Sequence, residues 1–137
     1  MSQVVLVDTS VFVYALGGRH RFQQPCREFL WSARDQGLEL HASVEMVQEL
    51  VFHRMRKVDP RTAVEQGRLA ARACVLHAFD ERVLGRALEM IEAGRLRGRD
   101  AVHAATAEVA GITGIVSTDS AFDDVIDRID PAQWTAG

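Results

Sequence analysis

A run of apolar, mostly β-branched residues that ends on an aspartate constrains the fold of this chain more than any other feature. Residues 4–7 read VVLV, and Asp8 follows directly. A strand with no polar position has no side for solvent, so this run predicts a strand covered on both faces, as in a parallel sheet flanked by helices. The charge at the end of that strand then needs a separate explanation.

Further strand-like segments alternate with segments of helical periodicity. Strands are also predicted at residues 38–43, 74–79, 114–119 and, as a short fifth, 128–130. Helices are predicted from near Ser10 to Gly17 and over residues 24–36, 43–57, 59–73, 80–94 and 100–111. Ser43, Asp59 and Asp80 are suited to N-caps, and glycines follow several helix ends. The alternation predicts an α/β fold with a central, mainly parallel sheet of four to five strands.

Length and composition predict one globular domain over residues 1–137. The chain is 47% hydrophobic and 26% charged, without repeats or a linker. The formal net charge of −3 argues against binding nucleic acid by bulk electrostatics, so such binding would need local basic patches. Cys26 and Cys74 stand in no CxxC frame, which predicts free thiols. No signal-peptide core or long apolar segment is present, so we expect a cytoplasmic protein with no membrane segment.

Carboxylates recur where strands end. Asp8 closes the first strand, and Asp119 closes the strand at residues 114–119. Ligands of open α/β sheets bind beyond the carboxyl ends of the strands. One aspartate after a strand is usually a turn former or a helix cap, but two at the same edge favour a ligand site. Hydroxyl side chains stand beside both aspartates, at Thr9, Ser10, Ser117 and Thr118.

Two more carboxylates are candidates for the same site. Asp100 is predicted to open the helix over residues 100–111, where an N-cap role would also explain it. The alanines of that helix allow a close approach to the sheet, which would bring Asp100 towards the strand ends. Glu49 lies mid-helix between Met46 and Phe52, so apolar neighbours flank it, although a surface glutamate remains an alternative.

Four carboxylates at one edge would repel each other at short range and would drive one or more to take up protons. A divalent cation removes that conflict. An all-oxygen, carboxylate-rich site suits Mg²⁺ or Mn²⁺, which complete their coordination with water or substrate phosphate oxygens. Zinc fits less well, because the five histidines are scattered and show no HExxH spacing.

The stretches VDTSVF, QEL, RGRDAVHAATA and STDSAFDDV resemble PIN-domain proteins, specifically the VapC-type toxins of bacterial type II toxin-antitoxin pairs. The resemblance spans nearly the whole chain in order and length. It implies a three-layer α/β/α sandwich and a growth-inhibiting ribonuclease that uses Mg²⁺ or Mn²⁺ to cleave RNA. It also implies a cognate antitoxin and a second copy of the chain, in a homodimer, as partners. The implied catalytic site consists of Asp8, Glu49, Asp100 and Asp119.

The same resemblance implies individual roles within that site. Glu49 would either bind the metal through a water or orient the attacking water. Ser10 would support Asp8 by hydrogen bonding, and Thr118 would do the same for Asp119. The residues closest to the metal would be Asp8, Asp100 and Asp119.

Asp123 and His103 are additional candidates. Many relatives carry a further carboxylate just before the phenylalanine of the last motif, but Ala121 occupies that place here. Asp123 would replace it as a ligand, or else cap the segment that follows. His103 lies three residues after Asp100 on the same helical face, where a structural role and a catalytic role both remain open.

Basic residues precede the third acid. Arg95, Arg97 and Arg99 alternate just before Asp100, and guanidinium groups suit phosphate oxygens. Arg97 and Arg99 are therefore predicted to bind RNA, with a solvated loop as the alternative. A second basic cluster is predicted to be a solvated helix end stabilised by the helix dipole, with a binding patch as the alternative. That cluster consists of His53, Arg54, Arg56 and Lys57.

Two other functions compete with a ribonuclease. A haloacid-dehalogenase-like phosphatase also has a nucleophilic aspartate after its first strand, but it expects a second aspartate two residues later, where this chain has Ser10. The only lysine, Lys57, is not in the setting that this family requires. A non-enzymatic binding module with a PIN-like fold is the other alternative. Four carboxylates kept together without a metal would cost it stability.

Overall fold

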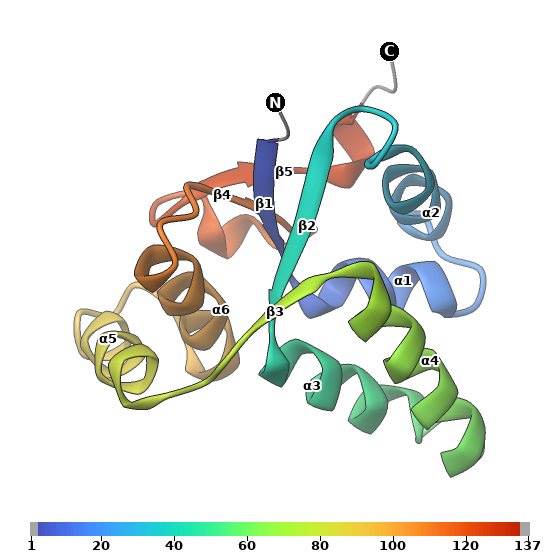
Figure 1. Cartoon of the computed structure of the whole chain (residues 1–137), viewed down its shortest axis with the longest axis horizontal. Coiled ribbons are helices and arrows are strands. Elements are labelled where there is room, and N and C mark those ends of the chain that lie inside the picture. The colour runs from blue at the N-terminus through green and yellow to red at the C-terminus, as the bar shows by residue number, and fades with distance from the viewer. Residues whose placement is uncertain (1–2, 135–137) are drawn as a thin grey trace.

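The computed structural model describes residues 3–134, which form a five-stranded sheet in the order β3-β2-β1-β4-β5 with helices on both sides (Figure 1). All four strand pairs are parallel. The strands are β1 (Gln3–Val7), β2 (Leu38–Ser43), β3 (Val75–His77), β4 (Gly114–Val116) and β5 (Asp127–Ile129). The helices are α1 (Thr9–Leu16), α2 (Gln23–Ser32), α3 (Val44–Arg54), α4 (Pro60–Ala73), α5 (Glu81–Glu92) and α6 (Gly98–Val109), with 3-10 turns η1 (Ser120–Phe122) and η2 (Pro131–Gln133).

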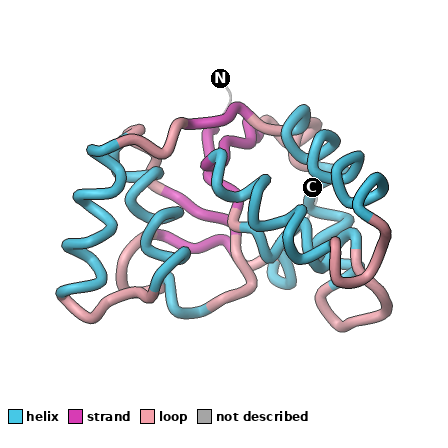
Figure 2. The backbone as a smooth tube through the Cα atoms, turned by 90° about the horizontal axis from the view of Figure 1, so that it is seen from below, coloured by secondary structure: helices cyan, strands magenta, loops and turns pink. Residues whose placement is uncertain are grey.

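The apolar part of β1 lies between two hydrophobic cores, as the sequence predicted. Val5 and Val7 pack into the core that α1 to α4 cover, whereas Leu6 packs into the core beneath α5 and α6. All three side chains are fully buried. Figures 1 and 2 show the two helix groups on opposite sides of the strands. The predicted three-layer α/β/α sandwich with a parallel sheet is therefore confirmed.

Most helix boundaries follow the predicted caps. The side chains of Ser43, Asp59 and Asp80 each accept a hydrogen bond from a first-turn backbone N–H of α3, α4 and α5. Gly94 and Gly111 follow α5 and α6 with φ of +73°, the left-handed conformation that ends helices at low cost for glycine.

Several predicted boundaries were wrong, including the end of α3, which lies at Arg54 rather than at residue 57. Helix α2 ends at Ser32 rather than at residue 36, because residues 33–36 turn back and the Leu38 N–H bonds the Ala33 carbonyl. Helix α1 begins at Thr9, with Asp8 rather than Ser10 at the cap position. Helix α6 begins at Gly98, so Asp100 lies inside its first turn rather than at its cap.

Several predictions concern the chain as a whole. Cys26 and Cys74 are free thiols, and burial raises the pKa of each to about 12. Across residues 3–134, no helix is both long and apolar enough to cross a membrane. We retain a single domain over residues 1–137 as a proposal, and residues 1–2 and 135–137 lie outside the described part of the chain.

Candidate active site

Asp8 lies at the carboxyl edge of the sheet, between the end of β1 and the start of α1. Its backbone N–H donates to the Val116 carbonyl oxygen at 2.9 Å, which joins the end of β1 to β4. Its Oδ2 accepts hydrogen bonds from Ser10 Oγ and Ser117 Oγ, both at 2.8 Å. Only 5% of Asp8 is exposed. The bond expected from Ser10 is present, and Ser117 supplies a second donor from the neighbouring strand end.

Asp119 lies in the turn after β4, because that strand ends at Val116 and not at residue 119. The backbone N–H of Asp119 donates to Ser117 Oγ at 3.0 Å, and its Oδ1 accepts from the Ala121 N–H at 2.9 Å. Thr118 contributes its backbone N–H to Ser10 Oγ at 3.4 Å. Within residues 3–134 its hydroxyl makes no hydrogen bond to Asp119. Ser117, not the predicted Thr118, therefore supports Asp119, because its Oγ lies between Asp8 and the Asp119 backbone.

Glu49 reaches the same edge on α3, which begins directly after β2. Its Oε1 accepts a hydrogen bond from Thr9 Oγ1 at 2.7 Å and lies 3.2 Å from His103 Nε2. Only 16% of its side chain is exposed, so it is not the surface glutamate of the alternative interpretation. Burial works to raise the pKa of Glu49, but the hydrogen bonds from His103 and Thr9 and positive charges nearby outweigh it and lower the pKa. The site therefore favours ionised Glu49.

His103 is a buried hydrogen-bond partner at the centre of these groups, with 1% exposure. Its Nε2 lies 3.2 Å from Thr9 Oγ1 and 3.6 Å from Asp8 Oδ1. Since the single hydroxyl proton of Thr9 is directed to Glu49, Nε2 must carry the proton of its own bond to Glu49. Burial works to lower the pKa of His103, but the bond to Glu49 and the adjacent carboxylate charges raise it. Among the described residues, nothing bonds its Nδ1.

The carboxylate of Asp100 lies near other negatively charged carboxylates. Burial, followed by the charges of Asp8 and Asp119, raises the pKa of Asp100 from 3.8 to about 6. Helix α6 brings Asp100 to the strand ends because its small side chains pack tightly against the sheet. The buried alanines of this helix are Ala101, Ala104, Ala105 and Ala107. The repulsion at Asp100 is the kind that a bound cation would relieve.

The predicted acids line one cavity of about 360 Å³, and the chemistry of this cavity fits a hard cation. The acids are Asp8, Glu49, Asp100 and Asp119. Within residues 3–134, no three His, Cys, Asp or Glu side chains stand as a ready-made cluster of ligands. Mg²⁺ does not require one, because it commonly binds one or two carboxylates and keeps several waters. The oxygen donors therefore suit Mg²⁺ or Mn²⁺ better than Zn²⁺.

Asp123 does not belong to this group of acids. Its Oδ1 accepts a hydrogen bond from Arg128 Nε at 2.6 Å, and Arg128 lowers the pKa of the carboxyl. Arg128 also donates to the Ser117 carbonyl oxygen at 3.0 Å. The structure therefore leaves Asp123 outside the cavity, where it anchors the arginine that holds the β4–η1 turn.

The predicted basic residues occupy different places. Arg99 NH1 lies 3.7 Å from Glu49 Oε2, with half of its side chain exposed, so Arg99 borders the acids. Arg97 is exposed at the N-cap position of α6. Arg95 lines another cavity. Arg54 was predicted to be solvated, but it is 8% exposed because its Nε donates to Gln66 Oε1 at 2.8 Å.

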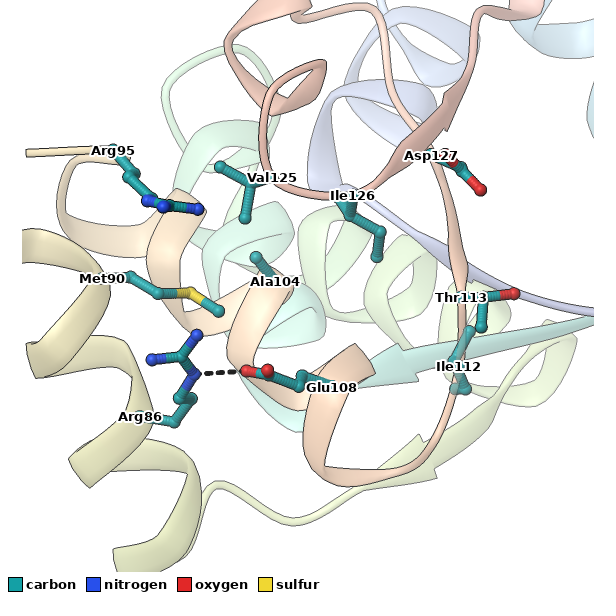
Figure 3. Close-up of a pocket in the computed structure, with 10 residues that line it drawn as sticks. All are labelled: Arg86, Met90, Arg95, Ala104, Glu108, Ile112, Thr113, Val125, Ile126 and Asp127. Carbon is teal, nitrogen blue, oxygen red and sulfur yellow. Dashed lines mark hydrogen bonds and ion pairs between the residues drawn. The ribbon is translucent and has the colours of Figure 1, made fainter. Parts of the chain in front are cut away.

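That other cavity, of about 310 Å³, lies between α5, α6 and the segments that flank β4 (Figure 3). Arg86 forms ion pairs there with Glu108 and Glu89. Ile112 and Thr113 precede β4, so this cavity opens at the amino end of that strand. It lies away from the carboxyl edge where α/β folds bind ligands. The acidic cavity is therefore the stronger candidate for catalysis.

Comparison with known proteins agrees with this architecture. A family model described as the PIN domain matches residues 5–127. The chain belongs to the PIN domain family. This PIN-domain protein is 34% identical to Ribonuclease VapC7 of Mycobacterium tuberculosis over 137 residues, covering 98% of this chain and 94% of VapC7. It is 42% identical to Ribonuclease VapC23 of the same species over 48 residues, covering 35% of this chain and 38% of VapC23. The predicted resemblance to VapC-type PIN-domain proteins is confirmed.

Solved structures share the fold of this PIN-domain protein at low sequence identity. Mycobacterium tuberculosis VapC20, named as a Sarcin-Ricin loop cleaving toxin, aligns with a TM-score of 0.74 and 16% identity over 88% of this chain and 93% of VapC20. A chain of a toxin-antitoxin complex from Klebsiella pneumoniae aligns with a TM-score of 0.72 and 15% identity, over 93% of this chain and 97% of that chain. At such identities these likenesses support the fold alone.

The structure also includes site residues that the sequence interpretation did not assign. Thr9 and Ser117 were noted only as flanking hydroxyls, yet both bond site carboxylates directly. The available sequence signal was that Thr9 follows Asp8 directly and that Ser117 stands two residues before Asp119. The spacing of His103 from Asp100 indicated that it could lie near the site. Its hydrogen bond to Glu49 could not be predicted, because Glu49 lies 54 positions away in the chain.

Proposed function

We propose that this PIN-domain protein is a toxin of a toxin-antitoxin pair and cleaves RNA with the help of Mg²⁺ or Mn²⁺. The observation that supports it most is the convergence of Asp8, Glu49, Asp100 and Asp119 on one cavity, with the pKa of Asp100 raised to about 6. The relative VapC7 is named a ribonuclease, and VapC20 is named a toxin that cleaves the Sarcin-Ricin loop. Membership of the PIN domain family also argues against the phosphatase alternative.

The metal would be held by Asp8, Asp100 and Asp119, with Glu49 interacting through a water. A bound Mg²⁺ or Mn²⁺ supplies polarisation of the scissile phosphate and a more acidic water. Relief of the repulsion at Asp100 would contribute to the affinity for the ion. This assignment leaves Asp123 out, because Arg128 occupies its carboxylate.

The chain's own side chains would position the reaction. Ser10 and Ser117 hold Oδ2 of Asp8 through two hydroxyl donors, which limits the rotation of that carboxylate. Thr9 and His103 hold Glu49 in its ionised form. An ionised Glu49 suits acceptance of a hydrogen bond from the attacking water, and no side-chain nucleophile is then required. We propose His103 as a positioning residue for Glu49 and Asp8.

Binding of RNA would depend on local cations, since the net charge is −3. Arg99 borders the acids, and Arg97 is exposed two residues before it. We propose that both contact phosphate oxygens of the substrate. The acidic cavity itself would reject a polyanion in the absence of the metal, so we expect productive binding of RNA to require Mg²⁺ or Mn²⁺.

A protein partner has a candidate surface on the opposite side of α1. A cavity of about 500 Å³ between α1, α2 and α4 is mainly apolar, and Trp31 and Leu69 at its border are 69% and 55% exposed. Several structural neighbours were solved as toxin-antitoxin complexes. We propose that an apolar segment of the antitoxin binds there.

A homodimer remains our prediction as well. Its candidate surface is an exposed apolar row on α5, which consists of Leu84, Leu88 and Ile91.

The substitution Asp8→Asn tests the proposed function. Asparagine keeps the size of the side chain and an oxygen acceptor for Ser10 or Ser117, so we expect a folded protein by circular dichroism. Cleavage of RNA in Mg²⁺ or Mn²⁺ should fall by more than about 100-fold, because a metal ligand is lost. Asp35→Asn, at an exposed turn position, is the matched control and should cleave normally.

Two results would contradict the proposal. Full activity of Asp8→Asn, or undiminished cleavage in EDTA, would exclude a metal site at Asp8. Purified wild-type protein that leaves structured and unstructured RNA intact in Mn²⁺ would favour the binding-module alternative. Sequencing the ends of RNA cut after brief induction would identify the target.

A further inference from the structure

Phe52 is an exposed aromatic side chain beside the acidic cavity. It lies on α3, three residues after Glu49, so both side chains share one face of the helix. The ring is not part of either hydrophobic core, and 46% of Phe52 is exposed. An exposed phenylalanine is common alone, but this one contacts two arginines and lies next to a candidate catalytic site.

Two guanidinium groups contact this ring from different elements. Arg56 Cζ lies 5.0 Å from the ring centroid and Arg99 Cζ lies 5.8 Å from it, distances typical of cation–π contacts. Arg56 follows the end of α3, whereas Arg99 lies in the first turn of α6. The sequence predicted a solvated helix end for Arg56. In the described part of the chain Arg56 has no carboxylate partner, so its charge is available to a ligand.

The same contacts connect Phe52 to the acids. Arg99 NH1 lies 3.7 Å from Glu49 Oε2 while its guanidinium faces the Phe52 ring. His53, whose ring centroid is 6.5 Å from that of Phe52, lines the acidic cavity together with Glu49. The aromatic ring therefore lies next to two residues that border the acids, Arg99 and His53.

We infer that Phe52, Arg56 and Arg99 form a stacking platform for an unpaired base of the RNA, next to the phosphate that is cleaved. This inference rests on the proposed function and deepens it by naming the residues that would hold a substrate base, which must be unpaired to stack there. Aromatic rings and guanidinium planes both stack on bases, whereas bases inside a duplex are covered by their neighbours. Two cations beside the ring also complement the phosphates that flank a stacked base.

Charge balance favours RNA over a protein segment as the occupant. The cavity floor is acidic, so the ligand must be drawn to the site by a bound metal and by cations at its border. Arg56 and Arg99 supply positive charge where the exposed aromatic surface lies, a combination that suits a polyanion with flat apolar bases. An apolar peptide would gain little from two desolvated guanidinium groups.

The test uses an RNA oligonucleotide that the wild-type protein cleaves, and compares Phe52→Leu with Phe52→Trp. Leucine keeps apolar bulk without a ring, so we expect binding in a Glu49→Gln background with Mg²⁺ present, measured by fluorescence anisotropy, to weaken about 5- to 100-fold. In the active protein the same change should raise KM more than it lowers kcat. Tryptophan should retain binding. Phe79→Leu, a 37% exposed phenylalanine outside the acidic cavity, is the matched control and should bind normally.

Abasic substitution identifies the stacked base. Removal of the base at one position should weaken wild-type binding as much as Phe52→Leu does, and the protein change should have no further effect on that abasic RNA. The same sequence held in a duplex should bind weakly to wild type and variants alike.

The outcomes separate this inference from the proposed function. If wild type cleaves RNA but Phe52→Leu binds and cleaves as wild type does, the platform is wrong while the ribonuclease stands. If Arg56→Gln and Arg99→Gln weaken binding and Phe52→Leu does not, only phosphates are contacted and stacking is excluded. If Phe52→Leu weakens binding of an antitoxin and leaves RNA affinity unchanged, the surface serves a protein partner instead. A wild-type protein that neither binds nor cleaves RNA would overturn both.

Discussion

Asparagine in place of Asp100 should stabilise the metal-free protein at neutral pH although it removes a proposed metal ligand. The reason is the pKa of Asp100, which burial and the charges of Asp8 and Asp119 raise from 3.8 to about 6. A raised carboxyl pKa means that the folded chain holds the proton more tightly than the unfolded chain does. Ionised Asp100 therefore opposes folding, and a neutral amide of the same shape does not.

The size of the effect follows from that shift. A change of about two pKa units corresponds to about 3 kcal/mol in the free energy of unfolding. Asp100 lies in the first turn of α6, where an ionised carboxylate gains up to about 1 kcal/mol from the helix dipole, and this gain is lost in the variant. Solvent screening at this partly buried position lowers the figure further. We expect a net stabilisation of about 1 to 2 kcal/mol, or about 3 to 8 °C in Tm.

The sign depends on pH. Well below pH 3.8 Asp100 is protonated in the folded and unfolded chains, so it contributes nothing and the variant should match wild type. Between about pH 4 and pH 6 the folded chain retains a proton that the unfolded chain has released, so wild-type stability falls relative to the variant as pH rises. Above about pH 6 the full difference should be present.

Urea unfolding in EDTA at pH 4, 5.5 and 7.5 measures this difference. Glu81→Gln is the matched control, because Glu81 is an exposed acid in the first turn of α5 with no acidic cavity beside it, and it should not stabilise. Added Mg²⁺ should stabilise wild type more than Asp100→Asn, since the ion neutralises the same repulsion. A variant that is less stable at pH 7.5, or a difference that persists unchanged at pH 4, would refute the idea that these carboxylates repel each other.

Three other substitutions have defined outcomes. His103→Phe keeps the buried volume but removes the donor to Glu49, so RNA cleavage should fall about 10- to 100-fold while circular dichroism is unchanged; equal activity would show that the imidazole positions nothing. Gly67→Ala places a Cβ 2.4 Å from Val51 Cγ2, a stiff β-branched neighbour on α3, and should lower the free energy of unfolding by about 1 to 2 kcal/mol. Gly85→Ala meets no atom within 4 Å on α5 and should raise it by about 0.5 to 1 kcal/mol. Urea denaturation measures the free energy of unfolding of both glycine variants. A change in the same direction for both would contradict these expectations.

Local signals account for most of the fold that could be predicted. The caps at Ser43, Asp59 and Asp80 depend on contacts within three residues, so the sequence around each was sufficient. The burial of Val5, Leu6 and Val7 could be predicted because an apolar strand must be covered on both faces. The end of α2 was missed because its last predicted turn competes with a bond from the Leu38 N–H to the Ala33 carbonyl as the chain enters β2.

The sequence by itself determined which carboxylates could meet, because Asp8 and Asp119 follow parallel strands and such strand ends share one edge. Only the tertiary structure decided how each acid is held. Thr9 bonds Glu49 across 40 positions and Ser117 bonds Asp8 across 109, and no local pattern encodes such pairs. Only the structure likewise shows that Asp123 accepts a hydrogen bond from Arg128 and that Arg99 lies beside Glu49. Hydrogen bonds and charges act over a few ångströms, so their partners become known only when the packing of the helices on the sheet is known.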